Sequence, residues 1–83
     1  MSRRGKLDII NDILTASKDG AKKTQIMYIA NLSFTQVKGY LSFLKKVKLI
    51  DEKDENNGTP IFRKTEKGSE FLKRYKVLKG LIE

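Results

Sequence analysis

The chain has 83 residues, a formal net charge of +8 from 18 basic and 10 acidic side chains, and neither cysteine nor histidine. This length fits one small domain. The composition excludes disulfides and thiolate metal sites, and it lacks the commonest metal ligand and the usual general base at neutral pH. We therefore predict a protein without enzymatic activity, cofactor or metal, whose positive charge favours nucleic acid as a partner.

No apolar run approaches the length that spans a membrane, and no secretory signal is visible in the sequence. The lack of cysteine is compatible with a cytosolic location. We expect a cytoplasmic protein that makes no membrane contact and that, where its anionic partner is DNA, is associated with the nucleoid.

Residues 1–5 form a basic leader, which we interpret as a solvated end, with an arm that contacts DNA as the alternative. A first helix is predicted from Leu7 to Ser17, because apolar residues recur there at spacings of three and four. Gly20 is expected to end this region in a left-handed conformation. The stripe of this helix that faces the core consists of Leu7, Ile10, Ile13, Leu14 and Ser17.

A second helix is predicted from Thr24, as its cap, to about Ala30, after a short extended link over residues 21–23. Asn31 tolerates the left-handed conformation in which a helix ends. The residues of this helix that we expect to pack in the core are Ile26, Met27, Tyr28 and Ala30.

The most specific local signal is the turn that follows. Ser33 and Gln36 have the spacing of a capping box, in which each residue satisfies a free backbone N–H of the other. Leu32 and Val37 have the spacing of a hydrophobic staple. A third helix is therefore predicted over residues 34–47, and it makes a helix-turn-helix with the second.

The third helix has an apolar stripe and a polar face. Its small and polar residues suit a helix in the major groove of DNA, where hydroxyl and amide groups meet base edges and lysines hold phosphate. The plainer alternative is a surface helix with a solvated basic face. Phe43 falls toward the exposed side and indicates either packing under another element or a protein contact. The stripe consists of Phe34, Val37, Leu41 and Leu44, widened by Tyr40 and Val47, and the polar face consists of Thr35, Lys38, Gly39, Ser42 and Lys46, with Gln36 and Lys45 at its margins.

A hairpin is predicted over the next segment, with one strand at 50–55, a turn at 56–58 and a return strand from Pro60. The Asn-Gly pair in the turn is a strong hairpin signal because both residues accept positive φ. Proline is tolerated at a strand start or edge. We expect at least one of Ile61 and Phe62 to face the core.

The outgoing strand of this hairpin is acidic, which is awkward for a DNA-binding protein because phosphates repel it. Three arrangements remain open: the strand faces away from DNA, it pairs with a basic surface on a second copy, or the hairpin does not insert into DNA. An acidic edge also prevents unwanted strand pairing, which is the structural interpretation. The acids are Asp51, Glu52, Asp54 and Glu55.

A last helix is predicted from Glu66 to about Ile82, capped by Thr65. Its large apolar residues follow spacings of four, three and four, as in a coiled coil of about two heptads. The seam either covers the domain core or pairs with a second copy, and we favour a homodimer. The seam residues are Phe71, Tyr75, Leu78 and Ile82.

These elements predict an α+β fold, mainly α, of the winged helix-turn-helix class. Its parts are a basic leader at 1–5, the winged domain at 6–65 and a C-terminal helix at 66–83. The first functional hypothesis is a double-stranded DNA-binding protein, architectural or regulatory. The alternative is a protein–protein interaction module in a transcription or replication assembly, which Phe43 and the acidic strand favour. The predicted DNA contacts are Lys22, Lys23, Thr24, Gln25, Ser33, Thr35, Gln36, Lys38, Gly39, Ser42, Lys45, Lys46, Arg63 and Lys64.

Three stretches of the sequence resemble the archaeal ten-kilodalton winged-helix proteins of the chromatin-associated type. The resemblance implies an archaeal source, binding of double-stranded DNA with little sequence preference, and a homodimer formed by antiparallel pairing of the C-terminal helices in a short coiled coil. The stretches are Lys6-Leu7-Asp8-Ile9-Ile10, Lys23-Thr24-x-Ile26-Met27-Tyr28-x-Ala30-Asn31-Leu32-Ser33 and Thr65-Glu66-Lys67-Gly68-x-Glu70-Phe71-Leu72.

Overall fold

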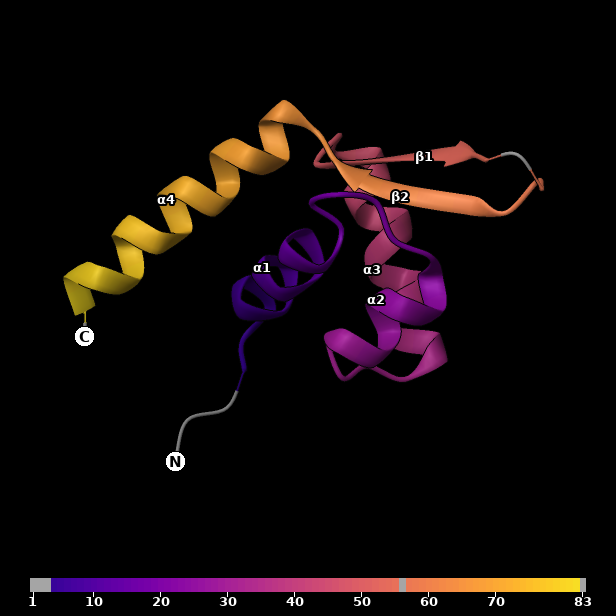
Figure 1. Cartoon of the computed structure of the whole chain (residues 1–83). Helices are drawn as coiled ribbons and strands as arrows, with labels where there is room; N and C mark the ends of the chain where they lie inside the picture. Colours follow the sequence, from indigo (N-terminus) through magenta and orange to yellow (C-terminus); the bar gives the residue numbers. More distant parts are fainter. Residues whose placement is uncertain (1–3, 56, 83) are drawn as a thin grey trace.

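The computed structural model describes residues 4–55 and 57–82 and contains four helices and one antiparallel hairpin (Figure 1). The described elements confirm the predicted winged helix-turn-helix class. Residues 1–3 of the predicted leader, Asn56 of the predicted turn and Glu83 of the predicted C-terminal segment lie outside the described residues. In chain order the elements are α1 (Lys6–Ala16), α2 (Lys23–Ile29), α3 (Phe34–Lys46), β1 (Ile50–Asp54), β2 (Pro60–Lys64) and α4 (Glu66–Ile82).

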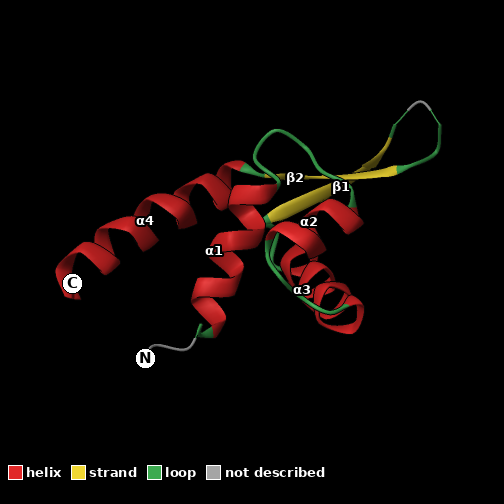
Figure 2. Cartoon of the chain, turned by 60° about the horizontal axis from the view of Figure 1, so that its bottom comes forward, coloured by secondary structure: helices red, strands yellow, loops and turns green. Residues whose placement is uncertain are grey.

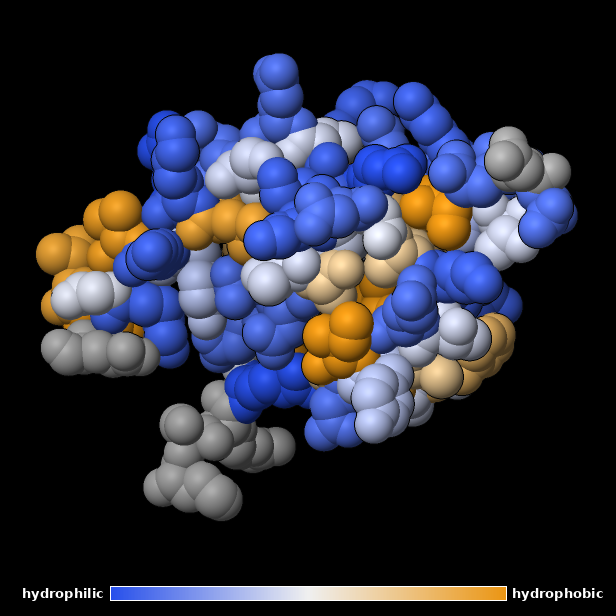
Figure 3. Space-filling view, viewed as in Figure 1, coloured by the Kyte–Doolittle hydropathy of each residue, from blue (hydrophilic) through white to orange (hydrophobic). Residues whose placement is uncertain are grey.

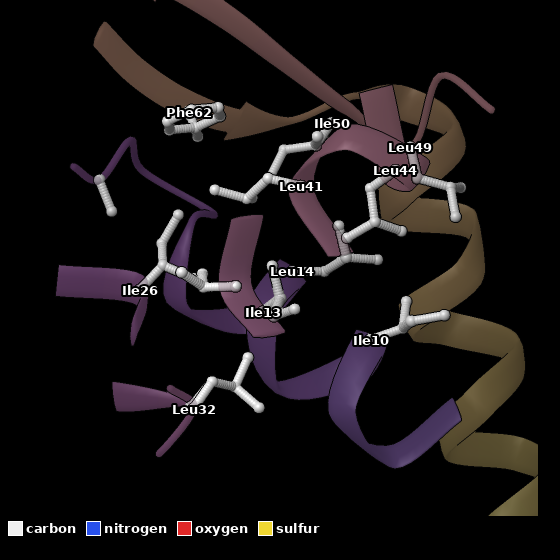
Figure 4. Packing of buried hydrophobic residues seen from close by; sticks show 13 residues of the cluster. Ile10, Ile13, Leu14, Ile26, Leu32, Leu41, Leu44, Leu49, Ile50 and Phe62 are labelled. Carbon is white, nitrogen blue, oxygen red and sulfur yellow. The ribbon is translucent and has the colours of Figure 1, made fainter. Parts of the chain in front are cut away.

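One apolar core lies between α1, α2, α3 and the base of the hairpin (Figure 4). Ile13, Leu14, Ile26 and Leu44 have no exposed surface. The spacings of three and four place such residues on one side of each helix, and their burial removes that side from water. The core residues are Ile10, Ile13, Leu14, Ala21, Ile26, Ala30, Leu32, Val37, Leu41, Leu44, Leu49, Ile50 and Phe62.

The first helix lies one residue earlier than predicted, and Gly20 has the expected left-handed backbone with φ 97°. The link after it forms a single bridge, in which Ala21 exchanges backbone hydrogen bonds with Phe62 at 2.8 and 2.9 Å. Leu7, predicted in the buried stripe, is 50% exposed. It lies in the first turn of α1, where the core covers only part of the helix.

The leader is not a free solvated end at Arg4. The Arg4 guanidinium donates to the carbonyl oxygens of Ala30 and Asn31 at 2.6 and 3.1 Å, and it forms an ion pair with Asp12 at 2.9 Å. Helix C-termini leave carbonyl groups without intrahelical partners. Arg4 therefore caps the end of α2 from another part of the chain.

Two predictions about α2 are wrong. Thr24 does not cap it, because Lys22 holds the cap position and its backbone N–H donates to the Gln25 side chain at 2.8 Å. Tyr28 does not pack in the core, since 86% of its surface is exposed. The helix has only seven residues, and its buried side is filled by Ile26 together with the C-cap residue Ala30.

The turn between α2 and α3 is confirmed in detail. Asn31 has φ 56°, and α3 begins directly after Ser33. The Gln36 backbone N–H donates to the Ser33 hydroxyl at 3.1 Å, and the Ser33 backbone N–H donates to the Gln36 side chain at 2.9 Å. Leu32 and Val37 are both buried, as a hydrophobic staple requires.

Phe34 is the exception within α3. It was expected in the buried stripe, but 56% of its surface is exposed. It is the first residue of the helix and lies at the edge of the stripe, where the Lys23 ammonium is 5.4 Å from the centre of its ring. This geometry is a cation–π contact.

The hairpin pairs Ile50 with Lys64 at its base and Asp54 with Pro60 at its outer end. Phe62 is 3% exposed, which confirms the predicted core contact from the return strand. Gly58 in the connection has φ 72°. The hairpin and α4 project from the helical body in opposite directions (Figures 1 and 2).

The first half of α4 is anchored to the body, and Gly68 is buried there against Leu49 and Lys64. Phe71 and Leu72 pack against the core. Thr65 caps the helix as predicted, because its hydroxyl accepts from the Gly68 backbone N–H at 3.0 Å. The same hydroxyl donates to the Lys48 carbonyl at 2.7 Å, which ties the start of α4 to the turn that follows α3.

Candidate nucleic-acid interface

Helix α3 presents its predicted polar face to solvent. Val37, Leu41 and Leu44 turn inward, so the residues on the opposite side of the helical wheel point outward. No other described side chain approaches a Cβ built at Gly39 within 4 Å, so that part of the helix is open to a close-fitting partner. The exposed residues of this face are Thr35, Gln36, Lys38, Gly39, Ser42, Lys45 and Lys46.

Two adjoining hollows lie between the start of α2, the side of α3 and the hairpin, and we call them together the wing cleft. Lys23, Glu52 and Phe62 line both hollows, so the surface is continuous. Lysines from two helices converge here on one concave surface, which is a suitable place for a phosphate backbone. The lining residues are Lys22, Lys23, Thr24, Lys38, Leu41, Ser42, Lys45, Glu52, Thr59, Pro60 and Phe62.

Three of the predicted polar contacts have structural roles. The Gln25 and Gln36 side-chain oxygens accept from backbone N–H groups at the starts of α2 and α3, and the Ser33 hydroxyl accepts from the backbone N–H of Gln36, the third residue of α3. Helix starts leave such N–H groups open, and these side chains satisfy them. All three residues are exposed, but their side chains are already fixed by these bonds.

The two basic residues of β2 lie apart from the wing cleft. Arg63 is paired with Asp51, and paired residues share one face of a hairpin, opposite to the face of their neighbours Glu52 and Phe62. The Arg63 guanidinium lies 3.9 Å from Glu55. The Lys64 ammonium donates to the Ser69 hydroxyl of α4 at 2.5 Å.

The acidic strand is neutralised in part by the chain's own basic residues. Glu52 forms an ion pair of 2.5 Å with Lys45 of α3, across the wing cleft. Glu55 lies on the other side, near Arg63. Sequence reasoning treated the four acids as one block, whereas alternation along the strand sends Glu52 to the face of Lys45 and Asp51 to the opposite face.

Phe43 is 40% exposed on the other side of α3, and the Lys6 ammonium lies 5.0 Å from its ring centre. It lines a hollow with Lys6, Gly39 and Tyr40, and a second, more apolar one that reaches Phe71 on α4. Phe43 is therefore accessible to a partner and lies outside the wing cleft.

The second half of α4 carries an apolar surface that the predicted seam covers only in part. Leu78 and Ile82 are 49% and 71% exposed, and so are two residues outside the four predicted seam positions, Val77 at 65% and Leu81, which flanks the seam, at 77%. Figure 3 shows these apolar side chains as an orange cluster at the C-terminal end of the molecule. We call Val77, Leu78, Leu81 and Ile82 the α4 tip.

Tyr75 of the predicted seam has an intramolecular partner. Its hydroxyl donates to the Asp8 carboxylate of α1, and the Lys79 ammonium lies 3.7 Å from the same carboxylate. The hydrogen bond from Tyr75, followed by one from the Gly5 backbone, lowers the pKa of Asp8, and the charge of Lys79 acts in the same direction. The same bond to the carboxylate raises the pKa of Tyr75.

Among residues 4–55 and 57–82, no group of three acidic side chains could hold a metal ion. Over the same residues, no helix is long and apolar enough to span a membrane.

Comparison with known proteins agrees with this architecture. A search of the curated proteins gave no significant match. Among solved structures, Sso10a-2, a DNA-binding protein from Sulfolobus solfataricus, matches with a TM-score of 0.82 and 29% sequence identity, covering 95% of this chain and 86% of that chain. This neighbour supports the resemblance to archaeal winged-helix proteins. The family model described as winged helix-turn-helix matches residues 3–83, so the chain belongs to the winged helix-turn-helix family.

Proposed function

We propose that this protein binds double-stranded DNA with α3 in the major groove and with lysines of the α3 face and the wing cleft on the flanking phosphates. The observation that carries the proposal is the convergence of Lys22, Lys23, Lys38 and Lys45 around an exposed helix with an open glycine. The structural neighbour Sso10a-2 is itself a DNA-binding protein, which supports this assignment.

The chemistry of the site favours phosphate contacts over base reading. The cations of α3 are all lysines, whereas bidentate recognition of guanine is best made by arginine. Two polar side chains at its start, Ser33 and Gln36, are held in the capping box. We therefore propose an architectural role at the nucleoid, with low sequence preference, ahead of a site-specific regulatory role.

Replacement of Lys38 and Lys46 by alanine tests the placement of DNA. Each lost phosphate contact should reduce the slope of log affinity against log salt by about 1. The matched control is Lys73→Ala with Lys76→Ala, which removes the same charge from exposed positions on α4. Fluorescence polarisation with one random-sequence duplex measures both. Equal losses in the two double variants would show that net charge, and not the α3 face, holds DNA.

We further propose that the protein is a homodimer joined through α4. The α4 tip is apolar and exposed, and apolar patches of this kind mark interaction surfaces. Of the predicted seam, Leu78 and Ile82 are available to a second copy, while Phe71 packs against the core and Tyr75 bonds to Asp8. In such a dimer two α3 helices would meet half-sites about 34 Å apart, or at a multiple of that distance.

The alternative function, a protein-interaction module, is favoured by Phe43. Its exposed ring lies between two hollows on the side of α3 away from the wing cleft. This alternative predicts that Phe43→Ala abolishes binding of a protein partner and leaves duplex affinity unchanged. If DNA affinity falls instead, Phe43 belongs to the DNA surface and the alternative loses its support.

A further inference from the structure

We propose that Glu52 limits the affinity of this protein for DNA, because its carboxylate competes with DNA phosphate for Lys45. The inference rests on the proposed DNA binding. It gives one of the four acids of the outgoing hairpin strand, Glu52, a role in the proposed DNA-binding site.

The position of Glu52 is set by the register of the hairpin. Glu52 lies directly opposite Phe62, and paired residues share a face, so both are directed to the wing cleft. Glu52 lines both hollows of that cleft and is the one acid among their described lining residues. The neighbouring Asp51 is paired with Arg63 and lies on the opposite face.

The ion pair with Lys45 is short but accessible. The Lys45 ammonium lies 2.5 Å from the Glu52 carboxylate, while the two side chains remain 46% and 29% exposed. Exposed ion pairs of this kind are weak and are screened by salt. A phosphate can therefore take Lys45 from Glu52, but it must break the pair and approach a carboxylate to do so.

The consequence for DNA binding has two parts. Without DNA, Glu52 neutralises one of the lysines that face the cleft. With DNA, its charge repels phosphate close to Lys23 and Lys38, which line the same hollow. The wild-type protein should then hold the duplex with about one phosphate contact fewer than its lysines allow.

The experiment compares Glu52→Gln with Asp51→Asn in salt titrations of a random-sequence duplex, with circular dichroism to confirm the fold. Both changes remove one negative charge from adjacent positions of the same strand. We expect Glu52→Gln to raise affinity on the order of tenfold and to steepen the salt slope by about 0.9. We expect a much smaller change from Asp51→Asn. The gain from Glu52→Gln should be clearly smaller in a Lys45→Ala background, because only the repulsion of phosphate near Lys23 and Lys38 is then left to relieve.

The outcomes separate this inference from the function on which it rests. Wild-type binding with equal effects of the two substitutions would overturn the role of Glu52 and leave DNA binding intact. A gain of the same size without Lys45 would overturn the competition between carboxylate and phosphate. Binding of the duplex by the Glu52→Gln protein but not by the wild-type protein would support the inference strongly. No binding by either protein at low salt would overturn both the inference and the proposed function.

Discussion

Helices α3 and α4 are both amphipathic, yet they expose opposite chemistry. The apolar stripe of α3 is buried at Val37, Leu41 and Leu44, and its solvent face is polar and basic. Helix α4 has 17 residues, of which only Gly68 is buried, and it ends in an apolar tip. The difference follows from geometry: α3 lies against the core along its length, whereas α4 extends beyond it (Figure 1). The exposed side of α3 suits an anionic partner, and the end of α4 suits an apolar one.

The largest effect is expected from a substitution at Gly68, where the first half of α4 packs against the body. A Cβ at Gly68 would collide with the Leu49 carbonyl oxygen and approach Lys64 Cβ to 3.1 Å, so Gly68→Ala should reduce the free energy of unfolding by about 3 kcal/mol. Gly80→Ala is the matched control, because nothing lies within 4 Å of a Cβ there. It should stabilise the helix by about 0.5–1 kcal/mol. Urea unfolding measures both, and a neutral Gly68→Ala would contradict the described packing.

Polar substitution at the α4 tip tests whether that surface joins two copies. Leu78→Lys with Leu81→Lys should shift the protein from dimer to monomer, because both side chains are exposed and a buried, unpaired charge is costly. Analytical ultracentrifugation over a concentration series gives the result. The described core does not include either residue, so the fold should be retained. A wild-type protein that stays monomeric at high concentration would refute the proposed dimer.

Two serines, the α3 cap Ser33 and Ser42 within α3, should differ in whether their loss lowers stability or DNA affinity. Ser33→Ala should cost about 1 kcal/mol of stability, because it removes the cap from the first turn. Ser42→Ala changes an exposed residue of the wing cleft and should leave stability nearly unchanged while weakening DNA affinity slightly. Thermal unfolding and polarisation measure the two effects. A Ser42→Ala protein less stable than Ser33→Ala would reverse these assignments.

The smallest expected effect concerns the contact between α4 and α1. The pKa of Asp8 is lowered, so the interactions of its carboxylate stabilise the fold at pH values above the ordinary pKa of 3.8. This stability is lost as the pH falls through the lowered pKa. The pKa of Tyr75 is raised, so its hydrogen bond stabilises the fold at pH values below the ordinary pKa of 10.0. This stability is lost as the pH rises through the raised pKa. Tyr75→Phe should therefore lower Tm modestly at neutral pH and have least effect at both extremes. A difference in Tm that does not vary with pH would contradict this link.

Much of the fold could be predicted from the sequence because its signals are local. The capping box at Ser33 and Gln36, the left-handed Asn31 and the spacing of the core residues each depend on a few neighbouring positions. The errors at Thr24, Tyr28 and Phe34 have a common cause. Each lies at or near the end of a helix, where neighbouring elements and not periodicity decide what is capped or covered.

The candidate site was predictable as a list of exposed residues but not as a surface. The alternation of side chains along β1 predicts two faces, but it does not show which of them lies against α3. The ion pair between Glu52 and Lys45 could therefore not be predicted from the sequence. In the same way, heptad spacing on α4 could not show that Tyr75 is bonded to Asp8 while Val77 and Leu81 are exposed. These are contacts between distant parts of the chain.

The basic surface of α3 and the wing cleft is proposed to bind the phosphates of DNA. The most direct measurement is polarisation of a labelled random-sequence duplex with the wild-type protein across a salt series. Our account predicts a linear fall of log affinity with log salt, with a slope near 0.9 for each phosphate contacted. A folded protein that does not bind the duplex even at low salt would contradict it.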